Sequence, residues 1–414
     1  MSLRVWLPLN GDINNQGLSN ITVTNNGATV DNNGKIGKCY SFDGTNDYLT
    51  CNYFINGFSQ FTFAFWYYGT TTLIEKVFLY RGAGAHRFKI SNGQFAFRDT
   101  SHSNQYYVDF SAIKPNTWVH VVAVYDNGSV YLYKDGVLDN SYINNTPSKM
   151  LSDLNEFRIG RIQSSSDDAY LNGKLNDFRI YDHALSQKEI KELSKGLVLH
   201  YKLDSNYSDI VYDCSGYCRN AIKYGNVTTN NSTPRNSLST VFPDNTSYIL
   251  LEDFSSADFS NLYTFSWWAK YTYTTQTMMW GYANGNKLNM YIKSNRYYWN
   301  SSGDGTQNPF GTISSKTYGD ENWHHFAITG DGTTTKLYID GEFKANATTY
   351  RGINGTSLVL NGYTTGTAYK FNGSLSDFRI YATALSDNDI KELYQTSASI
   401  DKDGNVFAYE FKED

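Results

Sequence analysis

The hydrophobic residues of this chain fall in short runs that are separated by turn-forming residues. Residues 118–125 form an almost wholly apolar run, and residues 129–133 lead directly into the Asp135-Gly136 pair. Asn-Gly and Asp-Gly pairs tolerate the positive φ angles that tight hairpin turns require. The pattern therefore predicts many short antiparallel strands and an all-β fold. In the first half of the chain such pairs stand at 10–11, 26–27, 33–34, 43–44, 92–93, 127–128, 135–136 and 172–173.

The pattern occurs twice. Residues 171–193 and 371–393 are identical at fifteen of 23 positions, at an offset of 200. Earlier motifs also return in the same order, among them Trp118-x-His120 as Trp323-x-His325. A repeat of about 200 residues with this strand spacing predicts a β-sandwich of the jelly-roll kind. We expect two tandem domains, 1–195 and 196–394, followed by a tail at 395–414.

Each repeat is predicted to finish with one short helix. Ser186 followed by Glu189 forms a capping box, and Ser386 with Asp389 repeats it. The tail beyond the second helix reads as a small β-hairpin on the Asp403-Gly404 turn. Its aromatic residues would dock either on a domain of the same chain or on a neighbouring subunit. Both readings stay open, and the second would make the protein a homo-oligomer.

Composition and charge support the all-β prediction and exclude some classes of function. The chain holds 35 Tyr, 33 Gly and 6 Pro, which suits strands and tight turns. Its net charge is −5, with no run of basic residues, so it lacks the positive surface that binds nucleic acid. No stretch approaches the roughly 20 apolar residues of a membrane helix. The N-terminus reads as a first strand rather than a signal peptide.

The cysteines and two matching histidines admit chemical and structural interpretations. Cys39 and Cys51 lie symmetrically about a turn and could face each other across a hairpin. Cys214 and Cys218 could close a small loop or supply half of a metal site, but no second Cys/His pair follows at zinc spacing. Reduced thiols are the favoured interpretation. His120, and equally His325, is read as a core residue on the inward face of its strand, beside Trp118, Val122 and Val124.

A family resemblance rests on the repeated motif. The strand Gly-x-Leu-x-Asp-Phe-Arg-Ile-Tyr occupies residues 173–181 and 373–381, and Ala-Leu-Ser-x-x-x-Ile-x-x-Leu follows it each time. With Trp-x-His upstream, this resembles the laminin G-like jelly roll of the concanavalin A-like superfamily, over residues 3–193 and 197–393. The opening Leu-Pro-Leu-Asn-Gly at 7–11, together with the segment 33–44, also resembles proteins of phages and prophages of gut Firmicutes, and so does the C-terminal Asp-Lys-Asp-Gly-Asn hairpin.

The resemblance implies a binding function. It implies a tail-associated virion protein that recognises a carbohydrate on the host cell surface, released from the host cytoplasm by lysis. One alternative is a structural virion component that binds other virion proteins. Another is a secreted, extracellular bacterial protein that binds glycans. The glucanases of this fold place their catalytic acids in a Glu-x-Asp-x-Glu-like spacing, which this sequence lacks, so we expect no enzyme activity.

Carbohydrate binding requires solvent-facing aromatic rings with polar groups beside them. A surplus of tyrosine also serves simply to cover the sheets, and Trp299 aligns with Phe97 in the first repeat, which favours a place in the core. Tyr298 aligns with Ala96 on the other face and is the better exposed candidate. The candidates are His102, Tyr106 and Tyr107 in the first repeat, and Trp280, Tyr298 and Trp299 in the second.

No cofactor is required by these motifs, but the resemblance implies that structural calcium is possible near strand ends. The candidate ligands are Asp43, Asp47, Asp177 and Asp377. Pro243 and Ser247 replace the first two in the second repeat, which makes calcium less favourable there. The alternative role for these aspartates is to cap turns.

Overall fold

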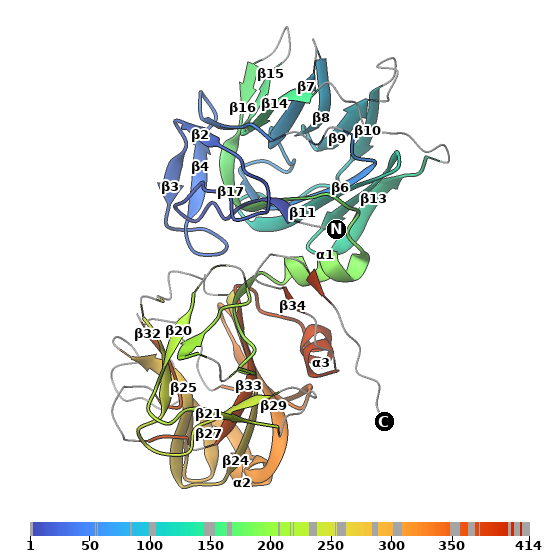
Figure 1. Cartoon of the computed structure of the whole chain (residues 1–414). Coiled ribbons are helices and arrows are strands. Elements are labelled where there is room, and N and C mark those ends of the chain that lie inside the picture. The colour runs from blue at the N-terminus through green and yellow to red at the C-terminus, as the bar shows by residue number, and fades with distance from the viewer. Residues whose placement is uncertain are drawn as a thin grey trace. The chain divides into compact units, whose positions relative to one another are not determined.

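The computed structural model divides into two compact units, of which the first ends at Lys195 and the second begins at Gly196. Sheets dominate both units (Figure 1). The structure describes residues 3–53, 55, 57–82, 85–98, 105–144, 154–163, 168–205, 208–215, 217, 219–231, 238–252, 254, 262–283, 289–300, 309–347, 357–362, 369–371, 373–395, 399–400 and 406–407.

Unit 1 is a sandwich of two antiparallel sheets. The first sheet has the order β13-β12-β11-β6-β17-β4-β3, with β1 also paired to β17, and the second has the order β10-β9-β8-β7-β14-β5-β2. The first holds β1 (Leu3–Leu7), β3 (Thr29–Asp31), β4 (Cys39–Asp43), β6 (Gln60–Gly69), β11 (Trp118–Asp126), β12 (Ser129–Lys134), β13 (Val137–Tyr142) and β17 (Asn172–Tyr181). The second holds β2 (Val23–Asn26), β5 (Tyr48–Cys51), β7 (Phe78–Gly82), β8 (Ala85–Ser91), β9 (Gln94–Arg98), β10 (Gln105–Asp109) and β14 (Leu154–Ile159), and a separate hairpin joins β15 (Arg161–Gln163) to β16 (Asp168–Tyr170).

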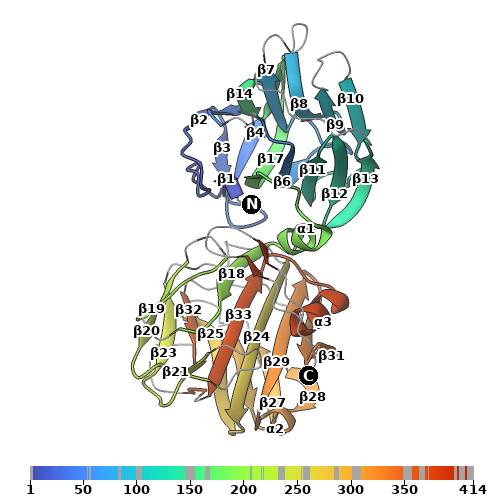
Figure 2. The same ribbon diagram turned by 45° about the vertical axis from the view of Figure 1, so that its right-hand side comes forward.

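Unit 2 repeats this topology with one strand added. Its sheets have the orders β21-β22-β33-β24-β29-β30-β31, with β18 on β33, and β19-β20-β23-β32-β25-β26-β27-β28. Figure 2 shows β33, β24 and β29 side by side. The first sheet holds β18 (Leu197–Tyr201), β21 (Thr228–Asn230), β22 (Ser239–Val241), β24 (Leu262–Thr272), β29 (Asp320–Asp331), β30 (Thr335–Ile339), β31 (Glu342–Asn346) and β33 (Ser374–Tyr381). The second holds β19 (Ile210–Val211), β20 (Ala221–Tyr224), β23 (Tyr248–Leu251), β25 (Gln276–Ala283), β26 (Asn289–Lys293), β27 (Arg296–Asn300), β28 (Pro309–Ser314) and β32 (Ser357–Leu360).

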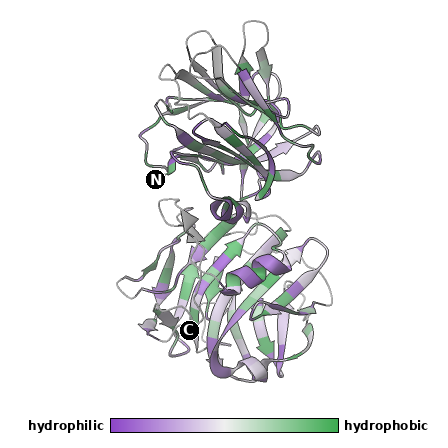
Figure 3. Cartoon of the chain, turned by 90° about the vertical axis from the view of Figure 1, so that its right-hand side faces the viewer, coloured by the Kyte–Doolittle hydropathy of each residue, from purple (hydrophilic) through white to green (hydrophobic). Residues whose placement is uncertain are grey.

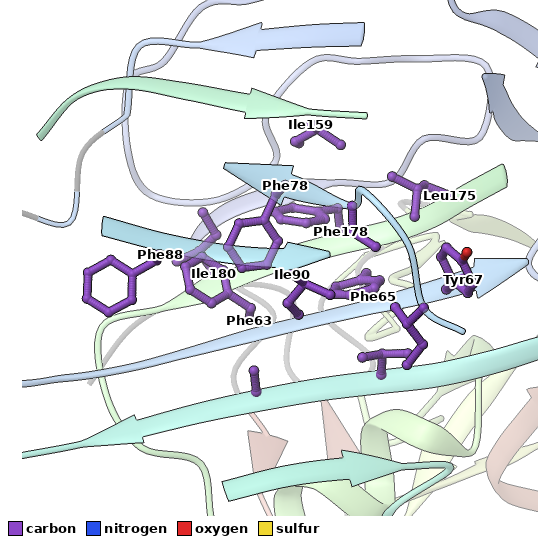
Figure 4. Close-up of a cluster of buried hydrophobic side chains, with 14 of the residues drawn as sticks. Phe63, Phe65, Tyr67, Phe78, Phe88, Ile90, Ile159, Leu175, Phe178 and Ile180 are labelled. Carbon is purple, nitrogen blue, oxygen red and sulfur yellow. The ribbon is translucent and has the colours of Figure 1, made fainter. Parts of the chain in front are cut away.

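The core of unit 1 lies between its two sheets and is rich in phenylalanine (Figure 4). Alternate residues of β6 point into it because successive side chains of a strand face opposite sides. The rings of Tyr80 and Phe157 stack 4.1 Å apart at 5°, and Phe63 lies 4.4 Å from Phe78. Burial of such rings supplies much of the driving force for folding. The all-β, two-sandwich prediction is confirmed.

The predicted helices and turns are also present. Helix α1 (Gln187–Ser194) begins after Ser186, whose side chain accepts from the Glu189 amide while Glu189 accepts from the Ser186 amide. Helix α3 (Asp387–Gln395) begins in the same way, with Ser386 and Asp389, and is largely hydrophilic in Figure 3. The Asp-Gly turn at Asp135 has φ angles of 48° and 79°, as a primed turn requires. No helix in the described part of the chain is long and apolar enough to span a bilayer.

The prediction of which face His120 takes is wrong. His120 is buried, but on the face of β11 away from the inter-sheet core, which Val119, Val121 and Ala123 fill instead. The imidazole lies 5.0 Å from the Trp66 ring, and burial lowers its pKa to about 3. The sheet is buried on both faces at this point, so apolar neighbours do not reveal which face the histidine takes.

Cys39 and Cys51 do not face each other across a hairpin. Cys39 lies in β4 and Cys51 in β5, and these strands belong to opposite sheets. Both thiols are free and buried. Cys218 lies outside the described residues. In the tail, β34 (Ser399–Ile400) pairs with β35 (Val406–Phe407), which confirms a hairpin, whereas Tyr409 and Phe411 lie outside the described residues.

One histidine gives unit 2 a pH-dependent contact next to helix α2 (Ser315–Tyr318). The His324 Nδ1 lies 2.7 Å from Asp340 Oδ2 and its Nε2 lies 3.2 Å from Asp320 Oδ1. The bond to Asp340 is the main cause that raises the pKa of His324. A raised folded-state pKa means that the contribution to stability is complete below about pH 6.5 and is lost as the pH rises through the folded-state pKa.

We expect the wild type to be more stable than His324→Asn at pH 6. The difference between their free energies of unfolding should fall as the pH rises from 6 to 8. Urea unfolding at several pH values measures this difference. The subtraction removes the effect of the other histidines, which the two chains share. A difference that is constant over this range would contradict the charged pairing of His324.

Candidate functional site

The structure places the ligand candidates of the first repeat in different environments. Tyr107, on edge strand β10, is 53% exposed, which confirms its predicted place on the surface. Tyr106 is half-buried, with its ring stacked 5.2 Å from Phe97 and 5.3 Å from Tyr142. It therefore serves the core more than the surface. His102 lies outside the described residues.

In the second repeat, two of the three candidates are wrong. Trp280 and Trp299 are completely buried, with ring centres 5.8 Å apart. Phe265 stacks on Trp280 at 4.6 Å. Both tryptophans occupy inward positions of their strands, where the space between the sheets demands large apolar rings. Tyr298 faces the other way and is half-buried, with its ring 5.6 Å from Tyr291.

Asp43 and Asp47 do lie together, in the turn that joins β4 to β5. Asp43 Oδ1 accepts from the amides of Thr45 and Asn46, at 2.8 Å and 3.2 Å, and these bonds lower the pKa of Asp43. Asp47 Oδ2 accepts from the Asp43 amide, and burial raises the pKa of Asp47. This geometry is that of aspartates that cap a turn. No group of three or more metal-binding side chains occurs within the described ranges.

Asp177 and Asp377 lie elsewhere, within bulges of β17 and β33 rather than before those strands. The Asp177 backbone has φ = 54°, and its amide donates to the Pro8 carbonyl. Its carboxylate accepts from Trp6 Nε1 at 2.6 Å and from Arg179 Nε at 3.0 Å. Asp377 likewise accepts from Arg379, at 2.7 Å, and His200 Nε2 lies 2.8 Å from it. An arginine thus neutralises each carboxylate, which fits an internal ion pair rather than a calcium ligand.

The change Asp177→Ala should lower the free energy of unfolding by about 3 to 5 kcal/mol, because it leaves the buried Arg179 charge without its carboxylate. The loss is expected to be the same with and without a chelator. Urea unfolding with and without EDTA measures it. A loss that disappears once EDTA has been added would show instead that Asp177 holds a metal.

A surface cluster that the sequence did not predict lies on the outer face of unit 1. We call Tyr48, Arg158, Arg161 and Tyr170 the first tyrosine cluster. The Arg161 guanidinium lies 4.8 Å from the centre of the Tyr48 ring and 5.2 Å from that of Tyr170. Arg158 lies 5.8 Å from the Tyr48 ring, and all four side chains are half-buried.

The local backbone explains how these residues meet. Tyr48 begins β5, where Leu49 points into the core and Tyr48 therefore points outward. Gly160, between β14 and β15, has φ = 84°, and a Cβ there would lie 2.6 Å from the Phe42 ring. Only glycine fits, and the bend starts the β15–β16 hairpin. In that hairpin Arg161 stands opposite Tyr170, so both reach the Tyr48 ring.

Unit 2 has a similar cluster at the same place. We call Tyr224, Tyr248 and Lys370 the second tyrosine cluster. Tyr248 begins β23 as Tyr48 begins β5, and its ring stacks on Tyr224 at 4.8 Å and 9°. The Lys370 Nζ lies 4.7 Å from the centre of the Tyr248 ring. Tyr224 is 36% exposed, whereas Lys370 is buried and its pKa is lowered by burial to about 8.

The two clusters share their chemistry but not all of their residues. Each places a cation on the ring of the equivalent tyrosine and adds a second tyrosine beside it. Cation–π contacts of this kind fix side chains that would otherwise have to be ordered on binding. Aromatic faces cover apolar C–H groups, while phenol and guanidinium groups donate hydrogen bonds. Together these groups suit a ligand that is both hydroxylated and partly apolar.

The sequence carried one signal for these clusters. Tyr48 and Tyr248 recur at the offset of 200 that relates the terminal motifs. Their partners could not be found in this way, because Arg161 corresponds to Gly362 and Tyr170 to Lys370. Each repeat thus brings its cation from a different position.

Both units are therefore jelly-roll sandwiches, and each carries a tyrosine cluster on an outer face. The family model for the concanavalin A-like lectin/glucanases superfamily matches residues 43–191 and 243–391, one copy in each unit. The chain belongs to this superfamily. No curated protein matches the sequence.

Several solved structures are similar to the chain in fold, all under 25% identical. Domain 4 of the arabinanase AbnA from Geobacillus stearothermophilus, in complex with arabinotriose, is 21% identical, covers 48% of this chain and 98% of its own, and has a TM-score of 0.36. The sialidase CBM40 of Ruminococcus gnavus, bound to α2,3-sialyllactose, is 18% identical over 34% of this chain and 84% of its own, with a TM-score of 0.29. Mouse laminin α1 domains LG4-5 are 11% identical over 80% and 86%, with a TM-score of 0.28.

Proposed function

We propose that this protein binds carbohydrate without cleaving it, and that the two tyrosine clusters are its contact sites. The observation that carries the proposal is the recurrence of a cation-stacked tyrosine at one position of both units, in a superfamily that includes lectins.

The ligand in this proposal is a chain of several sugar rings. The first cluster offers two tyrosine rings whose centres are 6.3 Å apart and two guanidinium groups, which exceeds what one small ring can contact. The second offers two parallel rings and one ammonium. Both sites belong to one chain, and we propose that a long repeating polysaccharide engages them together, since linked sites bind more tightly than either alone.

The biological setting that we propose is the tail of a phage or prophage, where the protein would attach to a surface polysaccharide of the host. Support for this setting comes from the sequence similarity of the segment 33–44 and the tail to phage proteins. The virion is accordingly the proposed location, with other virion proteins as further partners. A carbohydrate-binding function at the two clusters does not depend on this setting.

Binding of the purified full chain to a panel of bacterial surface polysaccharides tests the function. We expect at least one polysaccharide to bind, with no release of reducing sugar on prolonged incubation. Assays with and without EDTA show whether calcium contributes. Failure to bind any carbohydrate of the panel or any bacterial envelope would contradict the proposal, and steady release of reducing sugar would overturn its non-enzymatic part.

A further inference from the structure

A pocket of about 210 Å³ opens in unit 2, and none of its lining residues belongs to the second tyrosine cluster. Both sheets contribute to it, since Thr240 comes from β22 while Ile210 and Lys223 come from β19 and β20. The segment that follows β18 completes the wall with Lys202 and Asp204. The pocket therefore lies where the two sheets part at the edge of the sandwich.

The pocket depends on features that the first repeat lacks. Strand β19 is the added strand of the second repeat, because the corresponding sheet of unit 1 ends at β2 within the described residues. Tyr201 pairs with Phe378 as Leu7 pairs with Phe178, so Lys202 and Asp204 stand where unit 1 has Pro8 and Asn10. By the same register, Lys223 replaces Asn25. Compared with the first repeat, the second therefore has one additional strand and three additional charged residues around this pocket.

The polar groups of the pocket are held in place. Lys223 Nζ donates to the carbonyls of Ser205 and Ser208, at 2.6 Å and 3.0 Å, which leaves the third of its donors available. Thr240 Oγ1 donates to the Leu203 carbonyl and keeps its lone pairs for a ligand. The half-buried Asp204 carboxylate makes no hydrogen bond within the described part of the chain. A lining carboxylate without a donor is a group that a ligand hydroxyl would satisfy.

The remaining wall is apolar. Leu203 and Val211 are buried and line the inner side, while Ile210 and Tyr212 are 41% and 60% exposed. An exposed tyrosine beside an apolar strand is a ready surface for the C–H face of a ring. A concave site that joins an apolar wall to a few convergent polar groups is the usual form of a small-ligand site.

We propose that this pocket binds one neutral monosaccharide ring. The charges around the pocket indicate the class of ligand. Two ammonium groups, those of Lys202 and Lys223, line the pocket. Two carboxylates balance them, that of Asp204 in the lining and that of Asp209, whose charge acts on Lys223. Neither an anion nor a cation gains a net attraction, whereas a ring of hydroxyl groups can donate to the carboxylate and accept from the ammonium. The inference rests on the proposed carbohydrate binding and adds a third site to the two tyrosine clusters.

The experiment titrates the full chain with glucose, galactose, rhamnose, N-acetylglucosamine and glucuronate, and follows saturation-transfer NMR. We expect at least one neutral sugar to bind, and Asp204→Ala and Tyr212→Ala each to weaken its binding at least tenfold. Asn10→Ala and Tyr107→Ala are the matched controls from the first repeat and should change it less than twofold. Tyr212 is largely exposed, so its variant tests the pocket without disturbing the fold.

A second readout uses Cys214, whose side chain lines the pocket. In a Cys218→Ser chain, the bound sugar should slow alkylation of Cys214 severalfold. The proposal is overturned if no neutral sugar binds at tens of millimolar, if glucuronate binds best, or if binding survives in the Asp204 and Tyr212 variants. These outcomes are distinct from failure of the proposed function, which would appear as loss of polysaccharide binding with the pocket intact.

Discussion

A chain that carries Tyr48→Ala and Tyr248→Ala together is expected to bind its polysaccharide at least about 100-fold more weakly than the wild type. Each tyrosine holds the cation of its cluster, so its removal takes away a ring face and frees Arg161 or Lys370. Loss of a central aromatic contact costs about 2 kcal/mol or more, and a tenfold change in affinity corresponds to about 1.4 kcal/mol. Loss of both sites also removes the benefit of linkage. Biolayer interferometry on immobilised polysaccharide measures the effect.

The control for this prediction is Tyr107→Ala, which removes a more exposed tyrosine from unit 1 outside the clusters. We expect it to change the affinity less than twofold. Each single variant, Tyr48→Ala or Tyr248→Ala, should lose an intermediate amount of affinity for the polysaccharide. With a short oligosaccharide, each should show half as many binding sites per chain as the wild type. If the double variant binds as the wild type does while its thermal unfolding is unchanged, the clusters are not the contact sites.

The change Trp299→Ala is expected to lower the free energy of unfolding of unit 2 by about 3 to 5 kcal/mol. Trp299 is completely buried, and its ring lies 5.7 Å from Tyr263 and 5.8 Å from Trp280. Truncation leaves a cavity between two sheets that cannot close without breaking strand pairing. Urea unfolding followed by tryptophan fluorescence and circular dichroism measures the loss.

Tyr298→Ala is the matched control, because Tyr298 directly precedes Trp299 in β27 and its side chain points to the opposite face of the sheet. Its effect on stability should be much smaller than that of Trp299→Ala. A Trp299→Ala chain with wild-type stability but impaired carbohydrate binding would show that this ring serves the ligand, and would contradict its place in the core.

The sequence predicted the fold well because its signals are local. Asp-Gly pairs determine turns through the φ angles that those residues tolerate, as the Asp135 turn shows. Ser186 with Glu189 and Ser386 with Asp389 determine where α1 and α3 begin. The repeat carries these signals twice, so each half of the chain provides a check on the interpretation of the other.

The facing of individual side chains was predicted less well. A strand with both faces buried gives no alternation to read, so His120 was assigned to the wrong face of β11. Trp280 and Trp299 looked like ligand contacts because aromatic residues serve cores and binding surfaces alike. Asp177 lies in a bulge within β17, and a one-residue bulge redirects a side chain without any mark in the local sequence.

The tyrosine clusters needed tertiary information. Tyr48 and Tyr170 are far apart in the sequence and meet through the bend at Gly160, where the Phe42 ring of the other sheet leaves no room for a side chain. The pocket of unit 2 depends similarly on β19, a strand of two residues that no periodicity reveals. Both sites arise where irregular backbone interrupts a regular sandwich, which is where function commonly resides.

Hydrogen–deuterium exchange of the full chain, with and without a bound polysaccharide, tests the central claim most directly. The account predicts slower exchange in the segments that hold the two tyrosine clusters, around residues 48, 158–161 and 170 in unit 1 and around 224, 248 and 370 in unit 2. The polysaccharide should be recovered at its original length. Protection confined to other segments, or a shortened polysaccharide, would contradict it.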